Sequence, residues 1–367
     1  MSKRTLGKKF TSKGAEEFRE LLLGWYDRHA RILPWRYTKN QKPDPYRVWL
    51  SEIMLQQTTV AAVGPYFQKF TEKWPTIKAL ANAPAEDIMK EWAGLGYYSR
   101  ARNLHKCAQV VAHELSGAFP DNQDDLKKLP GIGDYTSAAI RAVAFNKPAT
   151  VVDGNVERVM ARYFAWPEPM PGAKKDLKNL ATGLFDEYAD RPGDLAQALM
   201  DLGATVCTPR SPRCGSCPVS KNCVARKRGI ASELPLQEKK KPRPRRFGHV
   251  YWITNGRGEV LVCRRPPKGL LGGMIGLPTT EWVTGKKMPA PPSFLKKIEI
   301  TDFGQSARHV FTHFKLELAL KSGHFSGKAP AGGYLWLKAE EVENAGFPTV
   351  FIKAVRLFNG GSGPRLK

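Results

Sequence analysis

The hydrophobic pattern of the chain changes once, close to residue 240. Before that point apolar residues recur at three- and four-residue spacing, beginning with Phe18, Leu22, Trp25 and Tyr26. Such spacing is typical of amphipathic helices. It predicts a first helix from about residue 15, and further helices at 47–72, 76–81, 85–93, 99–116, 124–129, 134–145, 153–164, 173–188 and 192–204. Short segments with Gly and Pro separate them, so this part is predicted to be mainly α-helical.

The pattern after residue 248 is that of strands. "HVYWIT" and "GEVLVCRR" flank a turn that contains Asn255-Gly256, which predicts a β-hairpin. Phe314, Leu316 and Leu318 alternate with polar residues, as on a half-buried strand. "AEEVENAG" and "TVFIKAVRLF" predict short helices. The last third of the chain is therefore expected to form a separate α/β domain.

The segment between the two patterns reads as a linker. "LPLQEKKKPRPRRFGH", residues 234–249, is rich in Pro, Lys and Arg and holds one acid, Glu238. Such a segment spaces domains apart, and its charge could also follow a phosphate backbone. The expected organisation is a basic arm at 1–14, a helical domain at 15–230, a linker at 231–247 and the α/β domain at 248–360.

The charge of the chain indicates which class of partner it binds. Lys and Arg number 58 against 34 Asp and Glu, which gives a formal net charge of +24. Surface charge for solubility is the simple explanation, and a nucleic acid partner is the sharper one. The sequence has no run of 18 apolar residues that could span a membrane. "MSKRTLGKKFTSKG" also lacks an apolar export segment, so the cytoplasm is the expected compartment.

Four cysteines form a cluster in the C-terminal part of the helical domain. Cys207, Cys214, Cys217 and Cys223 have the spacing C-x6-C-x2-C-x5-C. Cytoplasmic cysteines seldom form disulfides, so a cluster of four indicates a metal site. Four thiolates suit tetrahedral zinc or a four-iron cluster. The gaps of six and five residues differ from paired C-x2-C zinc knuckles, which favours iron–sulfur.

A glycine-containing turn lies in "LPGIGDYTSAAI". Gly131 and Gly133 allow a close backbone approach, and the helix that follows presents free N–H groups to an anion. A plain turn between two helices is the structural explanation. On so basic a chain, binding of a DNA phosphate is favoured.

Two carboxylates are candidates for chemistry. Glu52 lies on a predicted helix beside Trp49 and Leu55, and an apolar setting raises the pKa of a carboxyl group, as a general acid requires. Asp153 precedes an amphipathic helix and would cap it. An acid paired with a carboxylate that stabilises a sugar cation is a common way to break glycosidic bonds. Both residues also have structural explanations, a satisfied buried acid and a helix cap.

Several motifs together resemble one family. They are "LPWR" at 33–36, "SEIMLQQT" at 51–58, "GLGYYSRARNLH" at 94–105, "LPGIGDYT", "VVDGNV", the four-cysteine loop and "RRPPKGLLGGM" at 264–274. Over residues 15–358 the chain resembles the MutY-type adenine DNA glycosylases of the helix-hairpin-helix superfamily. The resemblance implies a mainly α-helical helix-hairpin-helix glycosylase domain with a [4Fe-4S] cluster loop, and a C-terminal α/β Nudix-like domain.

The resemblance also implies an activity. Such enzymes act on double-stranded DNA that carries 8-oxoguanine mispaired with adenine, and hydrolyse the N-glycosidic bond of an adenine taken out of the stack. Glu52 matches the acid that protonates adenine N7, and Asp153 the carboxylate that stabilises the oxocarbenium ion. Tyr135 and Asn155 match residues that support that charge and position the acids. A monomeric bacterial enzyme that works at the nucleoid, away from membranes, is expected.

Further positions match by the same resemblance. Endonuclease III-like enzymes carry a lysine where this chain has Tyr135, so Schiff-base lyase chemistry is not expected. Arg31, Trp35 and Arg36 match the lining of the adenine pocket. The DNA wedge is matched by Gln57, Thr58, Leu95 and Tyr97. Core packing is the simpler explanation for Leu95 and Tyr97. We expect Gln57 and Thr58 on the helix of Glu52, and Asp153 across a cleft from it.

The C-terminal domain is expected to recognise rather than hydrolyse. The glutamate-rich, magnesium-binding helix of an active Nudix hydrolase is missing after Gly269. Phe311, Thr312 and His313 match a Phe-Ser-His loop that reads 8-oxoguanine. Threonine keeps the hydroxyl and adds a methyl group, which bears on how well the lesion is told from guanine. Ile275 stands where a Trp is expected.

Three alternative functions can be compared with the sequence. An endonuclease III-like glycosylase/AP lyase on oxidised pyrimidines fits the helical part, but Tyr135 and the extra domain oppose it. A non-catalytic iron–sulfur DNA-binding protein would need Glu52 and Asp153 to be structural. A nucleotide-pool hydrolase would need the missing magnesium site.

Overall fold

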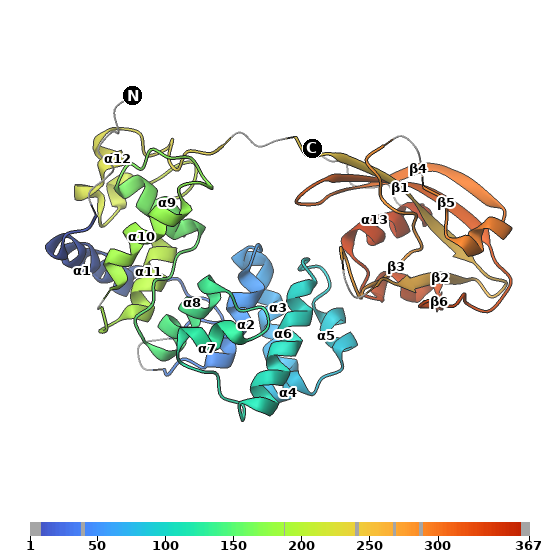
Figure 1. Ribbon diagram of the computed structural model, residues 1–367, viewed down its shortest axis with the longest axis horizontal. Coiled ribbons are helices and arrows are strands. Elements are labelled where there is room, and N and C mark those ends of the chain that lie inside the picture. Colours follow the sequence, from blue (N-terminus) through green and yellow to red (C-terminus); the bar gives the residue numbers. More distant parts are fainter. Residues whose placement is uncertain are drawn as a thin grey trace. The chain divides into compact units, whose positions relative to one another are not determined.

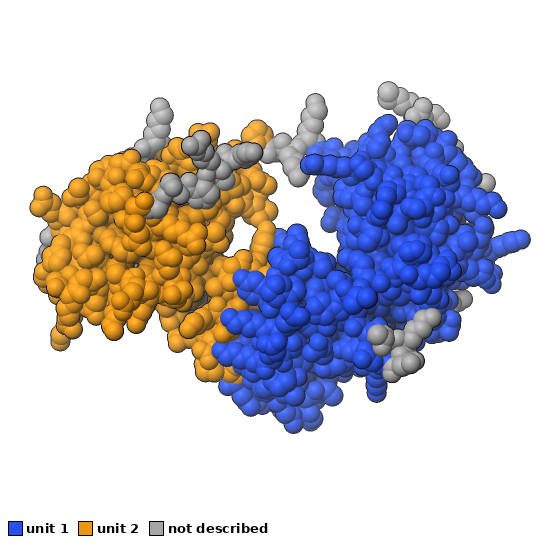
Figure 2. All heavy atoms as spheres, turned by 180° about the vertical axis from the view of Figure 1, so that it is seen from behind, with its two compact units in different colours: residues 1–82, 103–240 blue, residues 83–102, 241–367 orange. Residues whose placement is uncertain are grey.

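A computed structural model describes residues 9–37, 41–186, 188–238, 242–266, 269–285 and 289–360. The chain divides into two compact units, coloured separately in Figure 2. Unit 1 holds Met1–Asn82 and Asn103–Lys240, and unit 2 holds Ala83–Arg102 and Lys241–Lys367. The grouping of residues 83–102 with the C-terminal part was not predicted from the sequence. Much of the predicted basic arm, residues 1–8, and linker residues 239–241 lie outside the described residues.

Helices dominate the described part of unit 1 (Figure 1). The N-terminal segment gives α1 (Ser12–His29), α2 (Pro45–Leu55), α3 (Val60–Lys73) and α4 (Ile77–Ala81). The chain continues through α6 (Ser99–Gln109), a π-helical turn at Val110–Glu114, α7 (Gln123–Lys128), α8 (Asp134–Phe145), α9 (Gly154–Tyr163), α10 (Lys174–Phe185), α11 (Pro192–Thr205) and α12 (Val224–Lys227).

One segment that was predicted to form a single helix forms two helices. The apolar spacing over 47–72 predicted a continuous helix, but α2 ends at Leu55 and α3 begins at Val60. Gln57 between them adopts a positive φ of 58°, which no α-helix accommodates. The Thr59 side chain then accepts a hydrogen bond from Ala62 N–H and caps α3. Gln57 and Thr58 therefore lie in a turn after the helix of Glu52, and the expectation that they share it was wrong.

Helix α11 runs through the core of unit 1. It packs on α1, α8 and α9. Leu195, Ala196, Leu199 and Leu202 on this helix are completely buried. A Cβ atom added at Gly203 would lie 2.5 Å from Cβ of Asn155, so α11 and the start of α9 are in direct backbone contact. That contact fixes the N-terminus of α9, where Asp153 lies.

Unit 2 contains a six-stranded mixed sheet. Its path is β3 (Ile275–Gly276), β2 (Glu259–Arg264), β1 (Arg245–Thr254), β5 (Lys315–His324) and β4 (Ile300–Val310), and β6 (Tyr334–Lys338) pairs with β2. β1 and β2 are antiparallel, as the hairpin pattern predicted. β1 and β5 are parallel.

The described part of unit 2 also contains helices. The predicted helix over "TVFIKAVRLF" is α13 (Thr349–Phe358), which packs on β4, and α5 (Ala85–Glu91) comes from the N-terminal segment. "AEEVENAG" gives a short 3-10 helix at Ala339–Asn344. Between Gly269 and Gly285 the described residues form no helix. In the described parts of both units, no helix has the length and apolar character needed to cross a bilayer.

Candidate active site and cluster loop

A single cavity of about 1120 Å³ in unit 1 brings distant segments together. Its walls come from the 31–36 segment, the end of α2, the 131–136 hairpin, the start of α9 and α11. The sequence-predicted residues that line it are Arg31, Trp35, Arg36, Glu52, Gln57, Thr58, Gly131, Gly133, Tyr135, Asp153 and Asn155. The candidate acid and the second carboxylate, 101 positions apart in sequence, therefore face the same space.

Helix α2 delivers Glu52 to the cavity wall while keeping it almost buried. Its exposed fraction is 9%, and its neighbours Ser51, Ile53 and Met54 are buried. This burial raises the pKa of Glu52 to about 7, and the charge of Asp153 adds to the rise. A hydrogen bond from Tyr135 and the charge of Arg36 oppose it. A carboxyl group with this pKa holds a proton in a large fraction of molecules near neutral pH, as a general acid must.

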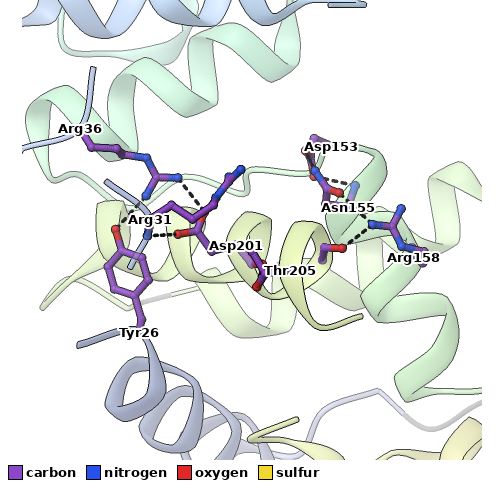
Figure 3. Close-up of polar contacts among 9 residues, drawn as sticks. Tyr26, Arg31, Arg36, Asp153, Asn155, Arg158, Asp201 and Thr205 are labelled. Atoms are coloured by element: carbon purple, nitrogen blue, oxygen red, sulfur yellow. Dashed lines mark hydrogen bonds and ion pairs between the residues drawn. The ribbon is translucent and has the colours of Figure 1, made fainter. Parts of the chain in front are cut away.

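Asp153 is held by donors at the start of α9. Its Oδ1 accepts from the backbone N–H groups of Asn155 and Val156, both at 2.9 Å, and so caps the helix. Asn155 Nδ2 donates to the other oxygen at 2.7 Å. The capping role predicted from sequence is present, and the same bonds fix the carboxylate at the cavity wall (Figure 3).

Arg158 connects this cap to the loop of cysteines. Its Nη2 donates to Asn155 Oδ1 at 2.8 Å (Figure 3). The same nitrogen donates to the carbonyl of Gly203 at 2.7 Å. The Nε of Arg158 donates to the carbonyl of Cys207 at 2.8 Å. Sequence reasoning missed Arg158, because an arginine on the polar side of a helix resembles ordinary surface charge.

The two arginines of the cavity share a partner that the sequence analysis also missed. Arg31 and Arg36 both form ion pairs with Asp201 of α11, at 2.7 and 3.0 Å. Arg36 also donates to the hydroxyl of Tyr26 at 2.9 Å. Trp35 is 6% exposed and packs edge-on against Phe67. Asp201 could have been noticed in the sequence, because it stands among the apolar residues Leu199, Met200 and Leu202.

The 131–136 hairpin depends on glycine at one position. Gly131 has a φ of +80°, and a Cβ atom there would lie 2.9 Å from Cβ of Asn103. Gly133 is the N-cap of α8, and nothing lies within 4 Å of its Cβ position. The turn is therefore open at the end where the first N–H groups of α8 are free of helical partners, which suits an anion.

Two of the four predicted wedge residues belong to unit 2. Leu95 is 7% exposed, whereas Tyr97 is 44% exposed and adopts a positive φ of 48°. Trp92 Nε1 and Arg100 Nη2 both donate to the carbonyl of Gly96, so the segment is built around a fixed backbone. Burial of Leu95 agrees with the packing explanation. The guanidinium of Arg100 lies over the Tyr97 ring, 5.6 Å from its centroid.

The segment at 311–313 lies with Tyr97 in unit 2. Tyr97, Phe311, Thr312 and His313 line a cavity of about 410 Å³, and the hydroxyl groups of Tyr97 and Thr312 are 2.8 Å apart. Phe311 stacks on Trp282 with ring centroids 5.8 Å apart. The ring of Phe311 packs inward, whereas Thr312 and His313 are exposed.

The four cysteines meet beside a buried arginine. Cys207, Cys214, Cys217 and Cys223 line one small cavity in unit 1. Arg162 is 1% exposed and donates to Cys207 Sγ at 3.3 Å and to the carbonyls of Leu234, Thr208 and Pro209. This guanidinium places positive charge beside the sulfurs, which suits bound thiolates.

The residues present fit an iron–sulfur cluster, because four cysteines line one cavity and such a cluster is held by four thiolates. A cluster bound to Cys207, Cys214, Cys217 and Cys223 would tie the loop together through four iron–sulfur bonds.

Three family models match separate parts of the chain. Residues 50–183 match the HhH-GPD superfamily of base excision DNA repair proteins. Residues 207–227 match the iron–sulfur binding domain of endonuclease III, which confirms the predicted iron–sulfur cofactor over zinc. Residues 249–357 match the NUDIX domain. The predicted fold class, a helix-hairpin-helix domain followed by a Nudix-like α/β domain, is confirmed.

Individual relatives are similar over nearly the whole chain. Human adenine DNA glycosylase is 34% identical over 94% of this chain and 74% of its own length. The rat adenine DNA glycosylase is 35% identical over 93% of this chain and 78% of its own. The structure of a thermostable thymine-DNA glycosylase matches 59% of this chain and 98% of its own, at 33% identity and a TM-score of 0.53.

A structure of endonuclease III bound non-covalently to DNA shares the helical fold, at a TM-score of 0.50 and 22% identity. The family predicted from the motifs is confirmed by relatives that extend across both units. The chain belongs to the adenine DNA glycosylase family.

Proposed function

We propose that this protein removes adenine mispaired with 8-oxoguanine in double-stranded DNA. One observation carries the proposal: Glu52, with a pKa near 7, and the donor-fixed Asp153 line the same cavity. Relatives over most of the chain are adenine DNA glycosylases. The base would leave the stack to enter the cavity, because the duplex shields its glycosidic bond.

In the proposed reaction Glu52 donates its proton to N7 of the adenine. The protonated base leaves with the electron pair of the C1′–N9 bond, and the sugar becomes an oxocarbenium ion. Asp153 lies in the same cavity and stabilises that positive charge, while Asn155 holds its carboxylate. Water then adds to C1′, and Glu52 accepts the proton that the water loses. This division of roles between two carboxyl groups is common in glycosidic cleavage.

The enzyme is proposed to be monofunctional. A lyase needs an amine that attacks C1′ and forms a Schiff base. The cavity presents Tyr135 at the position that the resemblance assigns to a lysine, and a phenol cannot form an imine. Arg31 and Arg36, also in the cavity, carry guanidinium groups, which are poor nucleophiles.

DNA binding and lesion recognition are proposed to use both units. In unit 1, the hairpin of Gly131 and Gly133 would bind a backbone phosphate. Gln57 and Thr58 at the cavity wall would face the gap left by the base. The cluster loop exposes further cations, Arg210, Lys221, Arg226 and Arg228. In unit 2, Tyr97 would stack and Thr312 and His313 would contact 8-oxoguanine. We propose that the protein works as a monomer at the nucleoid.

The test is incubation of the full chain with duplexes that place adenine opposite 8-oxoguanine, guanine or thymine, followed by alkali. Strand breaks at the first pairing, fewer at the second and none at the third are expected. A parallel reaction with borohydride is expected to leave no protein–DNA crosslink. Absence of breaks opposite 8-oxoguanine would contradict the proposed substrate, and an efficient crosslink would contradict the monofunctional mechanism.

A further inference from the structure

Asp201 is an acid with no access to solvent. Its exposed fraction is 0%, and it lies on α11 between Met200 and Leu202. A buried carboxylate is costly unless charged or polar groups compensate it. The mechanism proposed above assigns it no role, so its partners are the guide to what it does.

Both oxygens of Asp201 are directed at the cavity arginines. Oδ1 accepts from Arg31 Nε at 2.7 Å and from Arg36 Nη2 at 3.0 Å. Oδ2 accepts from the backbone N–H of Arg31 at 3.0 Å. Figure 3 shows the two guanidinium groups meeting at this carboxylate. Their side chains are 25% and 11% exposed, so solvent screens them only in part.

We propose that Asp201 is a positioning residue of the active site, which holds Arg31 and Arg36 along the cavity wall and balances their charge beside Glu52. The inference rests on the proposed function, because it concerns the same cavity and the same acid. α11 brings Asp201 to this place through its packing on α1 and α8.

The charge balance matters because of what surrounds Glu52. The titratable and charged groups that act on it are Tyr135 from α8, Asp153 at the start of α9 and Arg36 from the 33–36 segment. Arg36 favours the ionised form of Glu52 and so lowers its pKa. Removing the charge of Asp201 would leave Arg36 without its counter-ion and would strengthen that effect. Less Glu52 would then carry a proton at neutral pH.

The test compares the wild type with Asp201→Asn in single-turnover excision of adenine opposite 8-oxoguanine across a pH series. A fall of one unit in the pKa of Glu52 removes about nine-tenths of the protonated acid well above that pKa, and little of it well below. The variant is therefore expected to lose about tenfold in rate near pH ~8, and less than about threefold near pH ~5.5.

A matched control lies on the same helix. Asp194 forms an ion pair with Arg191 and does not line the cavity. Asp194→Asn is expected to keep the wild-type pH profile. If Asp201→Asn does not fold, Arg36→Gln and the double variant Asp201→Asn/Arg36→Gln replace it, because the double variant keeps the wild-type net charge. The fall of the excision rate with rising pH should then occur at lower pH in the double variant than in Arg36→Gln.

The outcomes separate the two claims. No excision by the wild type at any pH contradicts the proposed function itself. Excision by the wild type, together with an Asp201→Asn rate that is unchanged or reduced by the same factor at every pH, overturns the inference. A uniform loss would indicate that Asp201 only supports the fold.

Discussion

The hydroxyl group of Tyr135 donates a hydrogen bond to the carboxyl group of Glu52. This bond joins α8, which follows the glycine hairpin, to α2, and both residues line the cavity. It opposes the effect of burial on Glu52, because a donor favours the ionised form of a carboxyl group. Burial raises the pKa of Tyr135 well above its usual value, so the phenol keeps its proton and remains a donor.

Replacement of Tyr135 tests this bond. Without the hydroxyl, the pKa of Glu52 should rise further, so the fall of the excision rate in Tyr135→Phe should occur at higher pH than in the wild type. The maximal rate should drop by about tenfold, because a hydrogen bond to a charged group contributes about 1.5–3 kcal/mol and Glu52 loses its orientation. Tyr163→Phe on α9, outside the cavity, should keep the wild-type profile. An unchanged Tyr135→Phe profile would contradict the role of the bond.

The buried Glu52 should also make stability depend on pH. Its folded-state pKa of about 7 exceeds the ordinary value of 4.5, so between these values the native state binds more protons than the unfolded state. Stability therefore falls as the pH rises through this window. The glutamine in the Glu52→Gln variant does not titrate. The difference in free energy of unfolding, variant minus wild type, should therefore increase by up to about 3 kcal/mol from low to high pH, measured by urea denaturation. A difference that stays constant with pH would contradict the raised pKa.

The contact between α11 and α9 should be sensitive to one methyl group. Gly203→Ala places a Cβ atom 2.5 Å from Cβ of Asn155, which must move and take its hydrogen bond to Asp153 with it. We expect a loss of about 1–3 kcal/mol in stability and a larger proportional loss of excision rate. Thermal unfolding and single-turnover kinetics measure the two effects.

Gly24 in α1 is the matched control. Nothing lies within 4 Å of its Cβ position, so Gly24→Ala should keep full activity and gain about 0.5–1 kcal/mol from helix propensity. Equal behaviour of the two alanine variants would show that Gly203 does not position Asn155.

Loss of one cluster ligand should remove the iron. Cys217→Ser takes one of four thiolates from the loop, and we expect the visible absorption and bound iron to fall together, with a lower thermal midpoint. Cys107→Ala, at a buried cysteine outside the loop, should retain the iron. Equal iron content in both variants would contradict the assignment of Cys217 as a ligand.

Local sequence signals predicted most of the elements. Asp153 before an amphipathic stretch predicted the cap of α9, and Asn255-Gly256 predicted the β1–β2 hairpin. These features depend on a few neighbouring residues. The break at Gln57 was missed because neither Gly nor Pro marks it, and its positive φ has no local signature.

Contacts between distant segments could not be predicted from the sequence. The pair of arginines on Asp201 depends on α11 reaching the 31–36 segment, and the grouping of 83–102 with the C-terminal part depends on tertiary packing. Asp201 could have been singled out as an acid with apolar neighbours in the sequence, as Glu52 was, but its partners could not. The chemical identity of the site residues was therefore easier to predict than their partners.

The most direct test of the account is Glu52→Gln in single-turnover excision of adenine opposite 8-oxoguanine. Glutamine nearly matches the shape of glutamate and cannot donate an acidic proton. We expect binding of the mispaired duplex to remain within a fewfold of the wild type, and the excision rate to fall by at least about 100-fold. A Glu52→Gln enzyme that binds the duplex and excises adenine at close to the wild-type rate would contradict the assignment of Glu52 as the acid.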